Sequence, residues 1–144
     1  MLIGRRCARA GPVDSMVIVD TSIWIEYLDR FNPAIRDELI DLLQRDEVAT
    51  VGLIISELRR ACRSAGQVRA VVEALEPLEY READRVAWLH AGQLAAEASA
   101  RGRSLEIGDC LVAAIAFREG WTVFTLDRDF ERIPGLKLHR PRVI

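Results

Sequence analysis

The chain contains almost no lysine, and its few cysteines and histidines form no recognisable site. Nineteen of its 20 basic residues are arginine, and the one lysine, Lys137, lies close to the C-terminus. A P-loop lysine or a lysine Schiff base is therefore not expected. The three cysteines lack Cys-x-x-Cys spacing, and the two histidines, His90 and His139, lie far apart in the sequence. Any enzymatic chemistry must therefore come mostly from carboxylates, which favours a hard cation bound by oxygen ligands.

Long apolar runs are also missing. The longest, such as residues 111–117, are far shorter than the ~20 residues that span a bilayer, and no apolar signal-peptide region opens the chain. The 144 residues are 50% hydrophobic and 29% charged, which is typical of one globular domain. We therefore expect a cytoplasmic protein without a membrane partner.

The first 15 residues differ in composition from the rest of the chain. They carry Arg5, Arg6 and Arg9 against one acid, Asp14, and show neither helical nor strand periodicity. We interpret residues 1–15 as a flexible N-terminal extension and residues 16–144 as the domain. Met16 directly precedes an apolar run, so it could equally be the translation start.

Within the domain, short β-branched runs alternate with longer segments of helical periodicity. The expected strands are 17–19, 48–51, 78–80, 121–125 and 136–138. The expected helices are 24–28, one starting at Pro33, 52–63 and 68–75 on either side of a break at 64–66, 83–100, 107–119, and a short turn over 127–133. This order predicts an α/β fold with three layers, in which helices cover both faces of a mainly parallel sheet of four to five strands.

Acidic residues follow two of the expected strands. Asp20 ends the first strand, and Asp127 and Asp129 follow the fourth. In a parallel α/β sheet the carboxyl ends of the strands border the binding crevice. The alternative for each is helix capping, which is ordinary chemistry for an aspartate before a helix. Capping is favoured for Asp129, and for Asp20 when that residue is considered alone.

Two further acids occupy apolar helix faces. Glu57 shares a face with Ile54 and Ala61, and Asp109 shares one with Val112. Buried carboxylates are rare unless they are paired. A salt bridge to an arginine is the alternative for Glu57, and stabilisation by the helix dipole is the alternative for Asp109.

Taken together, these acids predict a metal site. Four carboxylates that converge on one sheet edge would repel each other by several kcal/mol at separations of ~4 Å. A divalent cation removes that repulsion. Mg²⁺ is the expected ion, with Mn²⁺ as a possible substitute, because both prefer oxygen ligands.

The chain from residue 16 to the C-terminus resembles PIN-domain ribonucleases, specifically the VapC toxins of bacterial VapBC toxin–antitoxin systems. The resemblance rests on the Asp-Thr-Ser motif at 20–22 after the first strand and on Glu57 after the second. It also rests on Asp109 at the start of a late helix and on the run 125–130, TLDRDF, after the fourth strand.

This resemblance implies a PIN-like fold and a Mg²⁺-dependent endoribonuclease that hydrolyses RNA phosphodiester bonds with metal-activated water. The residues it assigns to the metal and to catalysis are Asp20, Glu57, Asp109 and Asp127. The hydroxyls it assigns to contacts with acids, phosphate or water are Thr21, Ser22 and Thr125. Asp129 is close enough in sequence to replace Asp127 as the fourth acid, and the number of metal ions stays open.

An acidic site does not attract RNA by itself, so nearby arginines are needed. Arg59 and Arg128 are the phosphate-binding candidates, together with Arg60, Arg101 and Arg103. For each of these residues, solvated surface charge is the alternative interpretation.

The resemblance also implies a VapB-type antitoxin, whose C-terminal segment lies over the active-site groove, and a homodimer within a larger toxin–antitoxin assembly. Two other functions remain to be considered. The first is a catalytically silent PIN-like module that binds RNA or protein. The second, a phosphoaspartate receiver, fits poorly because Lys137 is badly placed and Asp20 has no acidic neighbour.

Overall fold

Four short strands form one parallel sheet at the centre of the molecule. The computed structural model describes residues 16–30 and 32–141, so the predicted N-terminal extension lies outside the described residues. The strands are β1 (Val17–Val19), β2 (Val48–Val51), β3 (Glu79–Arg81) and β4 (Thr122–Phe124), in the spatial order β3-β2-β1-β4. β1 is therefore a central strand, which its three buried side chains explain.

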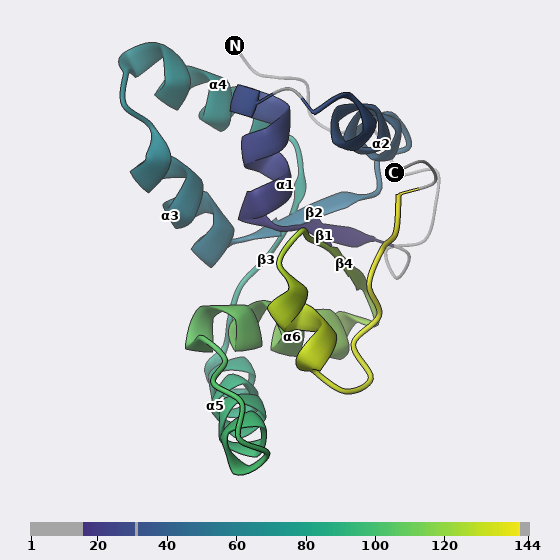
Figure 1. The fold of residues 1–144 in the computed structure, drawn as a ribbon. Coiled ribbons are helices and arrows are strands. Elements are labelled where there is room, and N and C mark those ends of the chain that lie inside the picture. The colour runs from purple at the N-terminus through teal and green to yellow at the C-terminus, as the bar shows by residue number, and fades with distance from the viewer. Residues whose placement is uncertain (1–15, 31, 142–144) are drawn as a thin grey trace.

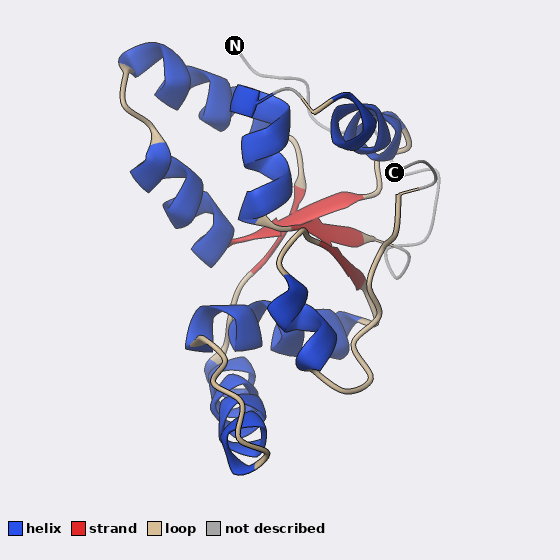
Figure 2. Cartoon of the chain, viewed as in Figure 1, coloured by secondary structure: helices blue, strands red, loops and turns tan. Residues whose placement is uncertain are grey.

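Helices cover both faces of this sheet (Figure 1, Figure 2). On one side lie α1 (Thr21–Ile25) with its π-helical continuation η2 (Glu26–Arg30), α2 (Pro33–Gln44), α3 (Gly52–Ala61) and α4 (Ala65–Leu75). On the other side lie α5 (Arg85–Ala100) and α6 (Ile107–Glu119). The 3₁₀ turn η3 (Arg128–Arg132) follows β4. The predicted three-layer α/β/α fold is therefore confirmed.

α6 is the central helix of the second layer. Seven consecutive residues from Cys110 to Ala116 are buried, so this helix is covered on all sides. Gly120 ends the helix in the left-handed conformation with φ +74°. The predicted span 107–119 is confirmed, and it places the residues of the first turn of α6 at the edge of the core.

Two predicted elements differ from the structure. Residues 136–138 form no strand; only Leu138 pairs with Val123, through one parallel bridge. Pro134 and Pro141 flank this segment, and neither offers a backbone N–H to a sheet ladder. Residues 65 and 66 do not break the chain either, because the Ser64 hydroxyl caps α4 by accepting from the Gln67 N–H at 3.1 Å.

The segment after the bridge is held against α2. His139 Nε2 lies 2.7 Å from the carboxylate of Glu38, which is buried on α2, and the His139 ring packs edge-on against Phe124. This buried acid is thus paired. Among the described helices, none is both long and apolar enough to cross a bilayer.

Candidate active site

Asp20 lies where two neighbouring strands end. β1 and β4 pair in parallel with Val19 opposite Phe124, so the next residues, Asp20 and Thr125, also lie side by side. The Asp20 N–H donates to the Phe124 carbonyl oxygen at 2.9 Å, which extends the ladder to the acid itself. Asp20 is 8% exposed and occupies the N-cap position of α1, yet its side chain makes no capping bond. The capping interpretation of the Asp20 carboxylate is therefore wrong.

Hydroxyl groups hold the Asp20 carboxylate instead. Thr125 Oγ1 donates to Asp20 Oδ2 at 2.7 Å, and Ser22 Oγ donates to the same oxygen at 3.0 Å. Both hydroxyls also accept backbone bonds, from Asp127 N–H and Leu126 N–H respectively. One network therefore fixes the Asp20 carboxylate and the start of the segment that carries Asp127.

Glu57 reaches the same region from α3. Thr21 Oγ1, in the first turn of α1, donates to Glu57 Oε1 at 2.6 Å. Its partner is therefore a hydroxyl, and no ion pair joins Glu57 to an arginine among the residues that the structure describes. The salt-bridge alternative for Glu57 is not found in that part of the chain.

Asp109 is brought close by the packing of α6 against α3. A Cβ atom at Gly108 would lie 2.9 Å from Leu53 Cδ2, closer than carbon atoms pack, so a glycine is needed for this approach unless Leu53 moves. Asp109 follows in the first turn of α6. The N-terminus of α6 thereby presents a carboxylate beside the one on α3.

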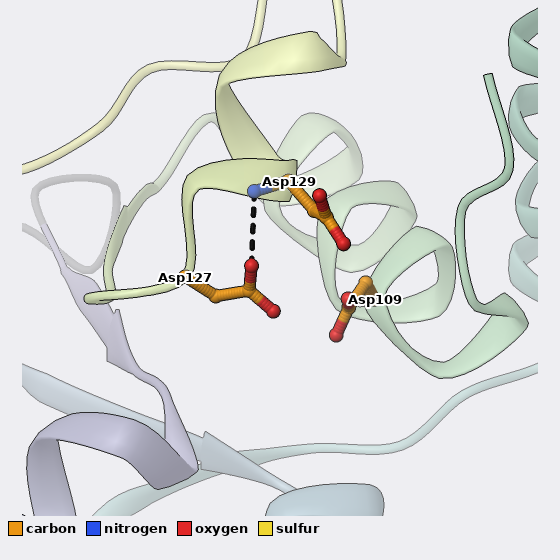
Figure 3. A group of neighbouring side chains, drawn as sticks. All are labelled: Asp109, Asp127 and Asp129. Atoms are coloured by element: carbon orange, nitrogen blue, oxygen red, sulfur yellow. Dashed lines mark hydrogen bonds between the residues drawn. The ribbon is translucent and has the colours of Figure 1, made fainter.

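Two further carboxylates come from the segment after β4. Asp109, Asp127 and Asp129 each place a carboxylate oxygen within 4.8 Å of the others. Figure 3 shows Asp109 at the start of α6 facing the two aspartates at the start of η3. Asp127 caps this turn, since its Oδ1 accepts from the Asp129 N–H at 2.9 Å (Figure 3). Capping was favoured for Asp129, and the structure assigns it to Asp127.

All these acids surround one cavity of about 330 Å³. Its lining residues are Asp20, Thr21, Ile25, Glu57, Arg60, Ala61, Glu106, Asp109, Asp127 and Asp129. Six of these ten described residues are acidic, and none of the ten is a cysteine, a histidine or a lysine. The structure thus brings together the acids that the sequence singled out.

Burial and the neighbouring carboxylates both perturb Asp109. Its pKa is raised from 3.8 to about 7, first by burial and then by the charges of Asp127, Asp20, Glu106 and Glu57. The dipole of α6, which favours a negative charge at this position, does not offset these effects. Without a counter-charge, the folded protein holds this group at a cost.

The donor set fits a hard divalent cation. Among the described residues, no ion pair neutralises Asp20, Glu57, Asp109 or Asp127, whereas Asp129 pairs with Arg132 at 3.2 Å. The available donors are carboxylate and hydroxyl oxygens, which Mg²⁺ and Mn²⁺ prefer over softer metals. The acidic cluster could therefore hold a metal ion.

The sequence analysis differs from the structure at two positions of this region. Of the two neighbouring arginine candidates on α3, Arg60 lines the cavity, whereas Arg59 is exposed and is not among its lining residues. Glu106, the N-cap residue of α6, was not anticipated. Its spacing of three residues from Asp109 places both on one side of the helix start, and this was the available signal.

Comparison with known proteins agrees with this geometry. The sequence model of the PIN domain matches residues 17–136. "Ribonuclease VapC21" of Mycobacterium tuberculosis is 31% identical over 107 residues, which cover 72% of this chain and 78% of the relative. The "tRNA(fMet)-specific endonuclease VapC" of Salmonella typhimurium is 35% identical over 77 residues, which cover 53% of this chain and 56% of the relative.

A solved structure matches most of this chain in three dimensions. The DNA-bound VapBC structure from Salmonella typhimurium contains a chain that is 29% identical, with a TM-score of 0.71 over 87% of this chain and 97% of that one. The matched residues 17–136 include every acid of the cavity. This chain therefore belongs to the PIN-domain family, in which it is similar to the VapC ribonucleases.

Proposed function

We propose that this chain is a Mg²⁺-dependent endoribonuclease and the toxin of a VapBC-type toxin–antitoxin module. The observation that carries this proposal is the cavity with six acids, in which Asp20, Glu57, Asp109 and Asp127 lack ion-pair partners among the described residues. Its relatives carry the names ribonuclease and endonuclease. The proposed substrate is RNA, which implies the cytoplasm as its compartment.

The four proposed metal ligands are Asp20, Glu57, Asp109 and Asp127, with Asp129 beside them. When bound, the ion would make water a stronger nucleophile near neutral pH and offset the negative charge that develops on the phosphate oxygens. In the hydrolysis, the water oxygen bonds to phosphorus and the bond from phosphorus to one ester oxygen breaks. A proton from the water ends on the leaving oxygen, so each cleavage yields one phosphate end and one hydroxyl end. A lysine, cysteine or histidine nucleophile is not available in the cavity lining.

The hydroxyls act by positioning the acids. Thr125 and Ser22 each donate a hydrogen bond to the Oδ2 atom of Asp20. The orientation of this carboxylate is therefore fixed before substrate binds. Thr21 does the same for Oε1 of Glu57. Among the described residues that line the cavity, Arg60 is the one cation, and we propose that it contacts the phosphate that is cleaved.

The alternative of a catalytically silent binding module is less well supported. A module that only binds has no need for a half-buried aspartate among other acids, where burial first and the neighbouring charges second raise the pKa of Asp109 to about 7. Such a cluster destabilises the fold unless a cation occupies it, and a functional site is where this cost is expected.

The purified chain is expected to cut RNA only when a divalent ion is present. Total bacterial RNA incubated with the protein and Mg²⁺ should yield discrete fragments, resolved by sequencing their ends. Excess EDTA should stop cleavage, and added Mg²⁺ or Mn²⁺ should restore it. Cleavage that persists in EDTA, or its absence with every class of RNA, would contradict the proposed function.

We propose that the antitoxin occupies a groove beside the acidic cavity. This groove, of about 540 Å³, lies between α1–η2 and α3–α4, with Leu28, Leu58 and Val71 among its lining residues. Ile25 and Ala61 line both the groove and the acidic cavity, so the two are continuous. An apolar peptide segment in this groove would end over the acids. Trp24 of α1 is not among the lining residues of this groove, because its side chain is fully buried in the core.

Replacement of Ala70 by glutamate should weaken antitoxin binding by about tenfold or more, which corresponds to ~1.4 kcal/mol. Ala70 is exposed on α4 and lines the groove, so the added carboxylate loses water when an apolar segment docks. Val72→Glu is the matched control, because Val72 is 51% exposed on the same helix and lies outside the groove lining. Equal dissociation constants for the two variants would contradict the assignment of the groove.

A further inference from the structure

A second cavity, rich in arginine, lies beside the acidic one. It has a volume of about 470 Å³ and is lined by Arg103, Arg128, Glu131 and Arg132. All four lining residues are charged, and three of the charges are positive. This lining differs from that of the groove between α1–η2 and α3–α4, which includes several apolar side chains. Its composition is that of a site for an anion.

The turn η3 separates the two cavities. Asp127 and Asp129 line the acidic cavity, while Arg128 and Arg132 line the basic one. These residues follow one another from the N-cap to the end of η3, and Asp129 pairs with Arg132 at 3.2 Å, so the two cavities are neighbours. A strand that passes over η3 therefore meets both the acids and the arginines.

Two of the three arginines have their charge available. Arg132 pairs with Asp129 at 3.2 Å, and Glu131 pairs with Arg140 at 3.6 Å. Arg103 and Arg128 form no ion pair with any residue in the described ranges 16–30 and 32–141. Two guanidinium groups thus face the cavity without a carboxylate partner there.

Backbone contacts hold the two segments that carry Arg103 and Arg128. Arg103 follows Gly102, whose φ of +77° allows the turn that ends α5, and the Arg103 N–H donates to the Ala98 carbonyl oxygen at 2.9 Å. Arg128 lies in η3 directly after Asp127, whose side chain caps that turn. Little backbone ordering is therefore needed when an anion binds between these two arginines.

We propose that Arg103 and Arg128 together bind a backbone phosphate of the RNA substrate, next to the phosphodiester that is cut. This inference rests on the proposed nuclease function and adds the direction in which the strand leaves the site, across η3 toward the end of α5. A guanidinium group can donate two parallel hydrogen bonds to the oxygens of one phosphate, whatever base that nucleotide carries. The contact therefore positions the strand and does not select its sequence.

The test compares Arg103→Gln, Arg128→Gln and the double variant with the wild-type chain. With RNA of a length that the wild type cleaves, KM should rise about tenfold in each single variant and more in the double, while kcat changes little. The salt dependence of RNA binding, measured in EDTA, should fall by ~0.7 in log–log slope for each lost phosphate contact.

Arg85→Gln supplies the matched control. Arg85 is an exposed arginine at the opposite end of α5, and the 16 residues of that helix span ~24 Å, so the same charge is removed far from the cavity. This variant should keep the wild-type KM and salt slope. Melting temperatures should agree among all four variants, because the arginines are exposed.

The outcomes separate this inference from the proposed function. Unchanged RNA binding in the double variant, or equal losses in Arg85→Gln, would overturn the inference while the nuclease stands. RNA binding that depends on these arginines in a chain that never cuts RNA would support the phosphate contact, but it would refute the proposed function and with it the position next to a cleaved phosphodiester. A double variant that loses antitoxin binding and keeps its RNA binding would assign the cavity to the antitoxin and also overturn the inference.

Discussion

Asp109→Asn is expected to abolish RNA cleavage and, at the same time, to raise the melting temperature of the metal-free protein. The amide keeps the shape of the side chain but removes a charged oxygen ligand, so the cleavage rate should fall by about 10³-fold or more. The pKa of Asp109, raised to about 7 by burial and by the neighbouring acids, shows that its charge is unfavourable in the folded protein.

The stabilising part of this prediction follows from the same repulsion. Removal of the charge relieves contacts with Asp127, Asp20, Glu106 and Glu57. Since Asp109 is partly exposed, solvent screens these interactions, and we expect a gain of about 1 kcal/mol, or roughly 3 °C in melting temperature. Calorimetry in EDTA measures this gain, and a nuclease assay in Mg²⁺ measures the loss of activity.

Asp37→Asn is the appropriate control. Asp37 is exposed on α2 and is absent from the lining of the acidic cavity, so its substitution should change neither stability nor cleavage. If folded Asp109→Asn protein cuts RNA at the wild-type rate, Asp109 is not a ligand. If instead this variant melts below the wild type in EDTA, the repulsion argument fails.

The positions of the acids could be predicted because they depend on local pattern. Asp20 and Asp127 follow apolar runs that form strands, and the parallel pairing of β1 with β4 places the ends of those strands together. Asp109 lies at the start of a strongly apolar helix, which can pack in few ways. Secondary structure and the rule for parallel sheets were therefore enough to predict the convergence of the acids.

The remaining features depend on how helices rotate against each other. Whether Arg59 or Arg60 reaches the cavity is decided by the rotation of α3, because adjacent helical residues point about 100° apart. The contribution of Glu106 depends on where α6 begins relative to α3, and the sequence pattern does not give that position. The resemblance named Ser22 and Thr125 as hydroxyl candidates, but their contact with Asp20 requires the register of β1 with β4, which sequence pattern alone does not specify.

The segment 136–138 shows the same limit for a strand. A strand is predicted there, but the described pairing is one bridge between Leu138 and Val123. Pro134 and Pro141 each lack an N–H donor, which limits the ladder on both sides of the bridge. The apolar residues thus favour a strand, whereas the length of the ladder depends on the flanking residues.

In the absence of divalent ions, the free energy of unfolding should fall as the pH rises from about 4 to about 7 and then level off. Asp109 has an unfolded pKa near 3.8 and a folded pKa of about 7, so within this window the folded state binds the proton more tightly than the unfolded state. Stability is therefore lost as the proton leaves, and above the folded pKa both states are ionised. Screening of this partly exposed group limits the expected loss to about 1–2 kcal/mol.

Mg²⁺ should reverse this loss at pH 8 and have little effect near pH 5, since a cation replaces the charge compensation that the proton supplies at low pH. Chemical denaturation at both pH values, with Mg²⁺ or with EDTA, measures the effect. Asp109→Asn should show a flatter pH profile in EDTA and a smaller response to Mg²⁺, while Asp37→Asn should behave as the wild type. A stability in EDTA that rises between pH 5 and 8, or a Mg²⁺ effect of equal size at both, would mean that these acids do not form one mutually repelling cluster.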